Sequence, residues 1–195
     1  MSSAAPRVAA FGNGLRAVVV PMPWRHTVSL SVFIRTGSLH EPRLLNGISH
    51  VVEHMAFKGT HTRDCQRINL DAERLGAEVN AHTDKDHTAY YMRGLGTHAP
   101  QFIAMLADIV RHATFPDDEL AREREVLLQE VAEVEDDPMT IAYQQFDQAC
   151  WGMHPAAQPV IGQRRVIERC TREQLIEHVR QHYTCLLYTS DAADE

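Results

Sequence analysis

The sequence predicts an α+β domain in which helices pack with a mainly antiparallel sheet. Segments with strand-like alternation of apolar residues come first, and segments with helical periodicity mix with them and then fill the second half of the chain. Short, hairpin-like connections join the strand segments, which favours antiparallel pairing. With 195 residues, of which 44% are hydrophobic and 23% charged, the chain has the composition of one globular domain.

The periodicities place the elements in order along the chain. We expect strands at 15–21 and 27–36, a helix at about 48–57, a helix at 63–75, a strand pair at 77–83 and 87–95, and helices at 98–112, 117–134, 139–151 and 171–183. The strand at 77–83 follows from Val79, Ala81 and Thr83, which alternate with polar residues. The acidic residues directly after Pro116 are typical of the first turn of a helix.

The helix at 48–57 carries the most informative motif, a pair of histidines four residues apart with a glutamate directly before the second. His50 and His54 share one helix face, so both imidazoles can reach one ion, and Glu53 lies at the edge of that face. Two imidazoles with an adjacent carboxylate are typical of a catalytic zinc site, in the order inverse to the commoner motif. The alternative is a polar helix face with two solvated histidines.

A zinc site needs a third protein ligand. The helix expected at 117–134 offers several carboxylates, and Glu123 and Glu130, seven residues apart, share one of its faces. Spacing alone leaves Glu130, Glu123, Glu125 and Glu133 open, and each could be an ordinary solvated residue.

Four segments carry a resemblance to a known family. They are Asn13–Arg16 before a strand, Gly47–Thr60 around the motif, Gly76–Thr83 followed by Thr88–Tyr91, and Glu123–Glu130 followed by Glu135–Pro138. Over about residues 11–184 the chain resembles the N-terminal domain of the pitrilysin/insulinase family of zinc metallopeptidases, the group that includes the mitochondrial processing peptidase.

The resemblance implies roles for individual residues. His50, His54 and Glu130 would bind one Zn²⁺ per chain, and Glu53 would be the general base. Glu123 would be a second carboxylate that supports the metal ligands without binding the ion. Asn80 and Ala81 match a segment at a sheet edge that pairs with the peptide substrate. The implied function is that of a zinc-dependent metalloendopeptidase acting on extended peptides or presequences.

The same resemblance divides the chain. Residues 1–10 are expected to be a flexible N-terminus, residues 11–184 a truncated catalytic domain, and residues 185–195 a tail that does not match the family. That tail resembles translated sequencing-adapter sequence, and a disordered acidic end is the alternative. Family members close a second, related half around the substrate. We therefore expect the isolated domain to cleave peptides poorly. The missing half would come from a second domain or from a partner chain in a homo- or heterodimer.

Composition excludes some function classes and favours a location. A formal net charge of −7 argues against nonspecific nucleic-acid binding and is compatible with cationic peptides. No apolar run reaches membrane-spanning length, and residues 1–10 lack a signal-peptide core, so a cytoplasmic bacterial protein is the simplest interpretation. The four cysteines show no paired spacing, and His178 and His182 are expected at the surface.

Two other function classes remain open from the sequence. One is a noncatalytic peptide-binding or assembly subunit of a two-chain peptidase complex, although such subunits typically lose motif residues and none is lost here. The other is a zinc hydrolase acting on a nonpeptide substrate, which the segment around Asn80 disfavours.

Overall fold

The computed structural model describes residues 5–184. Its strands are β1 (Arg7–Ala10), β2 (Arg16–Val19), β3 (Thr27–Ile34), β4 (Glu78–Thr83) and β5 (Thr88–Leu95). Its α-helices are α1 (Ile48–Ala56), α2 (Cys65–Arg74), α3 (Ala99–His112), α4 (Asp117–Glu135), α5 (Pro138–Trp151), α6 (Arg164–Ile167) and α7 (Arg172–His182). Short 3₁₀ turns lie at Ser38–His40, Arg43–Leu45, Gly96–His98 and Pro155–Ala157.

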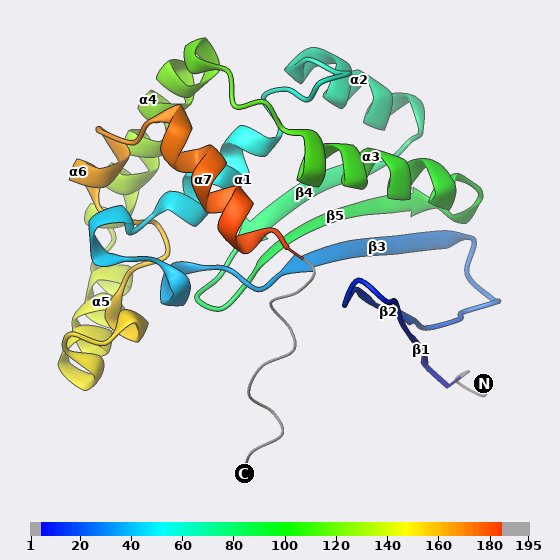
Figure 1. The fold of residues 1–195 in the computed structure, drawn as a ribbon. Helices are drawn as coiled ribbons and strands as arrows, with labels where there is room; N and C mark the ends of the chain where they lie inside the picture. Colours follow the sequence, from blue (N-terminus) through cyan, green and yellow to red (C-terminus); the bar gives the residue numbers. More distant parts are fainter. Residues whose placement is uncertain (1–4, 185–195) are drawn as a thin grey trace.

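The main sheet is antiparallel throughout, with the strand order β3-β5-β4. Strand β5 is central, so among the described residues β3 and β4 each have one edge without a strand partner. Helices α1 and α3 pack against this sheet from the same side (Figure 1). The α+β architecture with a mainly antiparallel sheet is therefore confirmed.

The core lies between this sheet and its helices because both present apolar stripes there. Tyr90 and Met92 of β5 are fully buried, as are Phe102 and Leu106 of α3. From α1, an apolar stripe formed by Ile48, Val51, Val52 and Met55 is buried, with Val51 at 1% exposure. Burying this stripe fixes which way α1 faces and leaves its polar face for other contacts.

Residues 7–10 belong to the segment that was expected to be a flexible N-terminus. They form β1, which pairs with β2 in a separate two-stranded hairpin. The turn favours this pairing because Gly14 adopts a left-handed φ of 86° and its N–H donates to the carbonyl of Phe11. Every residue of β1 is exposed, so no buried alternation marks this strand in the sequence.

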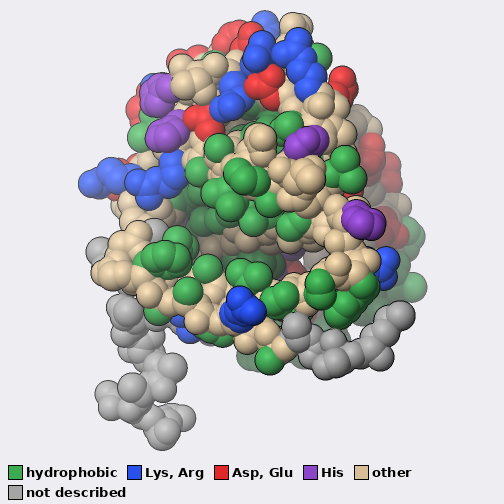
Figure 2. Space-filling view, turned by 90° about the vertical axis from the view of Figure 1, so that its right-hand side faces the viewer, with side chains coloured by type: hydrophobic (Ala, Val, Ile, Leu, Met, Phe, Trp, Pro, Cys, Tyr) green, Lys and Arg blue, Asp and Glu red, His purple; other side chains and the backbone are tan. Residues whose placement is uncertain are grey.

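A hollow separates this hairpin from the main sheet. Hydrophobic side chains gather around it on the face shown in Figure 2. The hairpin leaves large apolar side chains exposed, among them Val18 at 64% and Val19 at 57%.

Helix α4 runs beside α1 and brings the acidic residues of the second half of the chain to the histidine helix. Helix α7 also contacts α1. The short helix α6 was not expected from the sequence. Among the described residues, no helix is long and apolar enough to cross a membrane. The tail expected at 185–195 lies outside the described residues.

Candidate metal centre

Helix α1 places its two histidines side by side. The ring centroids of His50 and His54 are 4.6 Å apart, and the rings lie nearly perpendicular, at 78°. Both side chains are largely buried, with exposed fractions of 13% and 18%. The one-turn spacing in the sequence therefore produces two converging imidazoles.

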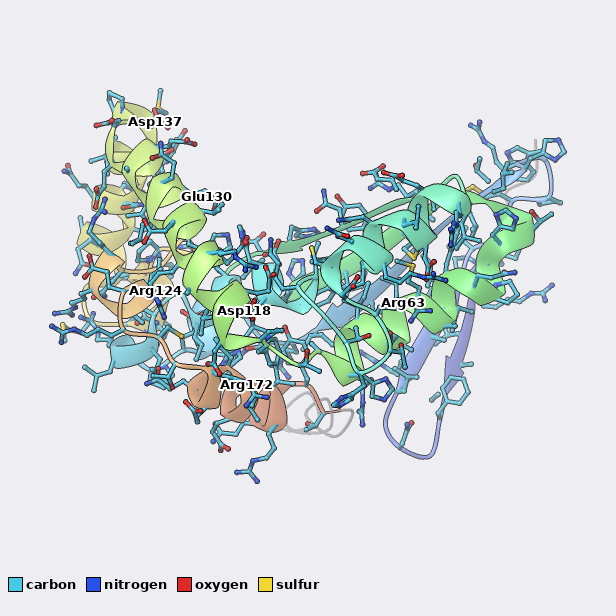
Figure 3. All side chains as sticks on the ribbon, turned by 90° about the horizontal axis from the view of Figure 1, so that it is seen from above. Arg63, Asp118, Arg124, Glu130, Asp137 and Arg172 are labelled. Carbon is cyan, nitrogen blue, oxygen red and sulfur yellow. The ribbon has the colours of Figure 1, made fainter. Side chains whose placement is uncertain are left out.

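Helix α4 supplies a carboxylate to this pair. Oε2 of Glu130 lies 3.6 Å from Nε2 of His50 and 3.6 Å from Nε2 of His54. Figure 3 shows Glu130 along α4, between Asp118 near the start of the helix and Asp137 beyond its end. Of the other candidates on this helix, Glu125 and Glu133 are exposed.

These three side chains fit a zinc ion. One ligand atom of each of His50, His54 and Glu130 lies within 4.8 Å of the other two. Zinc bonds to nitrogen and carboxylate oxygen of about 2.0–2.1 Å in a tetrahedron put neighbouring ligand atoms roughly 3.3 Å apart. The separations of 3.6 Å from Glu130 to each histidine are close to this value. Three protein ligands leave a fourth position open, as in catalytic rather than structural zinc sites.

Glu123 contacts the side of His54 that faces away from Glu130. Its Oε1 lies 2.8 Å from Nδ1 of His54, and its Oε2 lies 2.5 Å from Nζ of Lys58. With the proton on Nδ1 donated to Glu123, Nε2 presents its lone pair toward Glu130 and His50. Burial acts to lower the pKa of His54, but the hydrogen bond to Glu123 and the charge of Glu130 outweigh it and raise the pKa.

His50 lies in a different environment. Its Nδ1 is buried and has no hydrogen-bond partner among residues 5–184. Burial lowers the pKa of His50 to about 4, and the charge of His54 acts in the same direction. The backbone of Ile161 opposes this lowering of the pKa. A neutral imidazole at this position is the protonation state that binds a metal.

Glu53 is held by the sheet. Oγ1 of Thr83, at the end of β4, donates to Oε2 of Glu53 over 2.6 Å. Burial raises the pKa of Glu53, and the hydrogen bond from Thr83 acts against that rise. The carboxylate is therefore oriented beside the histidines with a pKa moved toward neutrality, as a general base requires.

Asn80 and Ala81 lie in β4, an edge strand of the main sheet among the described residues. They pair in register with Tyr91 and Tyr90 of β5. Ala81 is buried and Asn80 is exposed, and Oδ1 of Asn80 accepts a hydrogen bond from the N–H of Ala81 over 2.8 Å. The structure thus places both residues at a sheet edge on the strand that also carries Thr83.

Sequence reasoning missed three polar side chains around this centre. Thr83 was used only as part of a strand pattern, and Lys58 only as part of the segment Gly47–Thr60. The expectation of a surface position for His178 was wrong: it is 5% exposed, with Nε2 3.3 Å from Oγ of Ser49 and 3.4 Å from Oγ1 of Thr36. The spacing of four residues between His178 and His182 could have drawn attention to this pair, but the sequence does not tell which face of α7 is buried.

Comparison with known proteins assigns a family to this arrangement. The family model described as insulinase (peptidase family M16) matches residues 16–164. The uncharacterized zinc protease YmxG of Bacillus subtilis is 37% identical over 172 residues, which are 88% of this chain and 42% of that protein. The mitochondrial-processing peptidase subunit beta of Neurospora crassa is 31% identical over 172 residues, 88% of this chain and 36% of that protein.

A solved structure supports the fold. The crystal structure of a protease from Helicobacter pylori superposes with a TM-score of 0.88 at 23% identity, covering 94% of this chain and 45% of that one. At this identity the likeness shows the fold alone. The chain thus spans less than half the length of each of these relatives.

Proposed function

Because this chain belongs to the insulinase family of peptidases, peptidase family M16, we propose that it is the metal-binding domain of a zinc-dependent metalloendopeptidase. Its substrates are extended peptides, with basic presequences as one class. The observation that carries the proposal is the convergence of His50, His54 and Glu130, each with a ligand atom within 4.8 Å of the others.

Each residue of the centre has a part in the proposed reaction. His50, His54 and Glu130 would hold the ion, which would lower the pKa of the attacking water and polarise the carbonyl of the peptide bond. Glu53 takes a proton from the attacking water and later delivers one to the leaving amine. Thr83 orients the Glu53 carboxylate for both transfers through its hydrogen bond of 2.6 Å.

Strand β4 is the proposed docking edge for the peptide. An extended chain that adds to a sheet edge gains main-chain hydrogen bonds with limited dependence on side chains. A peptide that pairs at the N–H of Ala81 has to replace its present acceptor, Oδ1 of Asn80. Binding at this edge therefore requires the Asn80 side chain to turn away, which frees its amide to contact the peptide.

The proposed enzyme is completed by a second half, supplied by the same protein or by a partner chain. The domain spans 42% of its zinc protease relative in Bacillus subtilis, so more than half of that relative's length has no counterpart here. Groups that stabilise the charge of the transition state and exclude water typically contribute several kcal/mol to catalysis. We therefore expect the isolated domain to bind zinc and to cleave peptides slowly.

A noncatalytic peptide-binding or assembly subunit is the alternative. It would keep the fold and the sheet edge without needing a metal. The presence of all three proposed ligands, Glu53 and Glu123 favours the enzyme. A cytoplasmic location is also part of the proposal: within residues 5–184, Cys65, Cys150 and Cys170 form no disulfide, which suits a reducing compartment.

Zinc content tests the proposal. We would measure zinc per chain by elemental analysis in the wild type, in Glu130→Gln, and in the matched control Glu133→Gln, one turn further along α4 where the side chain is exposed. The proposal requires one zinc in the wild type and the control, and its loss or marked weakening in Glu130→Gln. Zinc in all three would remove Glu130 from the site, and zinc in none would favour the noncatalytic subunit.

A further inference from the structure

Helix α1 begins without a cap from its own sequence. The residue that precedes its first turn is Gly47, which has a left-handed φ of 104° and no side chain to accept a hydrogen bond. The first N–H groups of a helix have no partner inside the helix, and burying them unpaired costs free energy. Since Ile48 and Ser49 are fully buried, acceptors for this turn must come from elsewhere in the chain.

The buried carboxylate of Glu41 supplies those acceptors. Its Oε2 accepts from the N–H of Gly47 at 2.7 Å and from Nδ2 of Asn46 at 2.9 Å, and its Oε1 accepts from the N–H of Ser49 at 2.8 Å. Glu41 is only 4% exposed. Its negative charge lies at the positive end of the α1 dipole, which favours a carboxylate there.

A second segment holds this turn from the other side. Nε2 of Gln158 donates to the carbonyl of Glu41 at 3.0 Å, and Nδ2 of Asn46 also donates to the carbonyl of Pro159 at 3.0 Å. The backbones of Gly47 and Gly162 approach so closely that a Cβ on Gly47 would lie 2.6 Å from Cα of Gly162. These contacts fix Glu41 in place, and while its carboxylate is present the start of α1 has little room to shift.

His50 depends on this turn more than His54 does. His54 has Glu123 to orient its ring, with Nδ1 and the carboxylate 2.8 Å apart. Among the described residues, the Nδ1 of His50 has no hydrogen-bond partner, so no hydrogen bond at that nitrogen orients the ring. The position of its Nε2 is therefore set by the backbone of the first turn of α1 and by the packing around the ring.

We propose that Glu41 is a positioning residue of the metal centre, whose carboxylate fixes the first turn of α1 and thereby the ligand atom of His50. The inference rests on the proposed zinc site and adds to it a residue that touches none of the three ligands through its side chain. Loss of the carboxylate lets the first turn move, and the metal then loses affinity through His50.

Glu41→Gln tests this with almost no change in size. The amide keeps one acceptor oxygen, but its NH₂ group faces a backbone N–H, so two donors oppose each other. Glu41→Asp, which keeps the charge on a shorter side chain, is the second variant should the first fail to fold. The matched control is Asp108→Asn, because Asp108 is a buried carboxylate that accepts from Thr60, Thr62 and Arg63, away from α1.

Three quantities are measured for each protein: the zinc dissociation constant by chelator competition, the visible spectrum of the cobalt(II) form, and the Tm of the metal-free form. We expect Glu41→Gln to bind zinc about tenfold or more weakly, with an altered cobalt spectrum and with Glu41→Asp intermediate. Asp108→Asn should lower Tm and leave the zinc dissociation constant and the spectrum unchanged.

Three results overturn the inference. If folded Glu41→Gln binds zinc as the wild type does, Glu41 does not position the site. If Glu41→Gln and the control Asp108→Asn both lose zinc affinity in proportion to their loss of Tm, Glu41 acts on stability alone. A wild type that binds no zinc would instead overturn the proposed function, and this inference with it.

Discussion

The hydroxyl of Thr83 lies 2.6 Å from Oε2 of Glu53 and joins the end of an edge strand to the helix that carries both histidines. The same hydroxyl lies 3.4 Å from Oγ1 of Thr88, which donates to the carbonyl of Thr36. Glu53 is therefore oriented by the sheet and not by its own helix. This connects the proposed base to the proposed docking edge for the peptide.

Replacing Thr83 by valine should slow catalysis without removing zinc. Valine keeps the shape of threonine but cannot donate to Glu53, so the lowering effect of the hydrogen bond on the Glu53 pKa is lost and burial raises that pKa further. We expect the acid limb of the kcat profile to move to higher pH. The measurement is steady-state cleavage of a quenched fluorescent peptide, expressed as the ratio of variant to wild type, with Thr62→Val as control. An unmoved acid limb would separate Thr83 from the base.

Replacing Glu53 by glutamine should abolish turnover and leave the metal in place. The amide cannot take a proton, and loss of a general base typically costs about 10²–10⁴-fold in rate. Zinc content and peptide cleavage are measured on the same purified sample. Peptidase activity retained by a zinc-loaded Glu53→Gln variant would disprove the assignment.

Replacing Glu123 by alanine should weaken zinc binding by about 10–100-fold, the usual cost of losing a carboxylate that orients a metal-binding histidine. Without it, Nδ1 of His54 loses its hydrogen bond of 2.8 Å, and Lys58 is left as a cation near the centre. Chelator competition gives the dissociation constants, and Glu119→Gln, one turn earlier on α4 beside an exposed arginine, is the control. Equal zinc affinity in Glu123→Ala and the control would leave Glu123 without this role.

His178 should make the domain sensitive to acid. Burial, with the charges of His182 and His40, lowers its folded-state pKa from 6.5 to about 3, so the unfolded chain binds the proton more readily. The stability of the folded state is then complete above the unfolded pKa and falls as the pH drops from 6.5 toward 3. Between pH 7 and pH 5 this one group should remove about 2 kcal/mol from the free energy of unfolding.

Urea unfolding of the wild type and of His178→Gln at both pH values measures this effect. Glutamine can still bond to Ser49 or Thr36, the two hydroxyls near Nε2, but it does not titrate. The pH dependence should be smaller in the variant by that amount, whatever its stability at pH 7. If the free energy of unfolding depends on pH identically in both proteins, His178 binds its proton as readily in the folded state as in the unfolded chain, and the prediction is wrong.

Much of the fold could be predicted because its signals are local. The strands at 27–36 and 87–95 and the helix at 117–134 were expected within a few residues of β3, β5 and α4, since alternation and helical stripes reflect burial. Strand β1 could not be found this way because all its residues are exposed and only its pairing with β2 defines it. Helix α6, at Arg164–Ile167, is too short to show a period.

By itself, the sequence determined that His50, Glu53 and His54 share a helix face, because one turn of helix fixes the spacing of residues four apart. From spacing alone, it left four carboxylates of the helix at 117–134 open as the third ligand, and only the family resemblance pointed to Glu130. The tertiary structure lays α4 against α1, which puts Oε2 of Glu130 3.6 Å from both imidazoles and leaves Glu125 and Glu133 exposed. It also turned His178 inward and brought Glu41 to the start of α1, because which side chains meet across packed elements depends on the packing and not on sequence spacing.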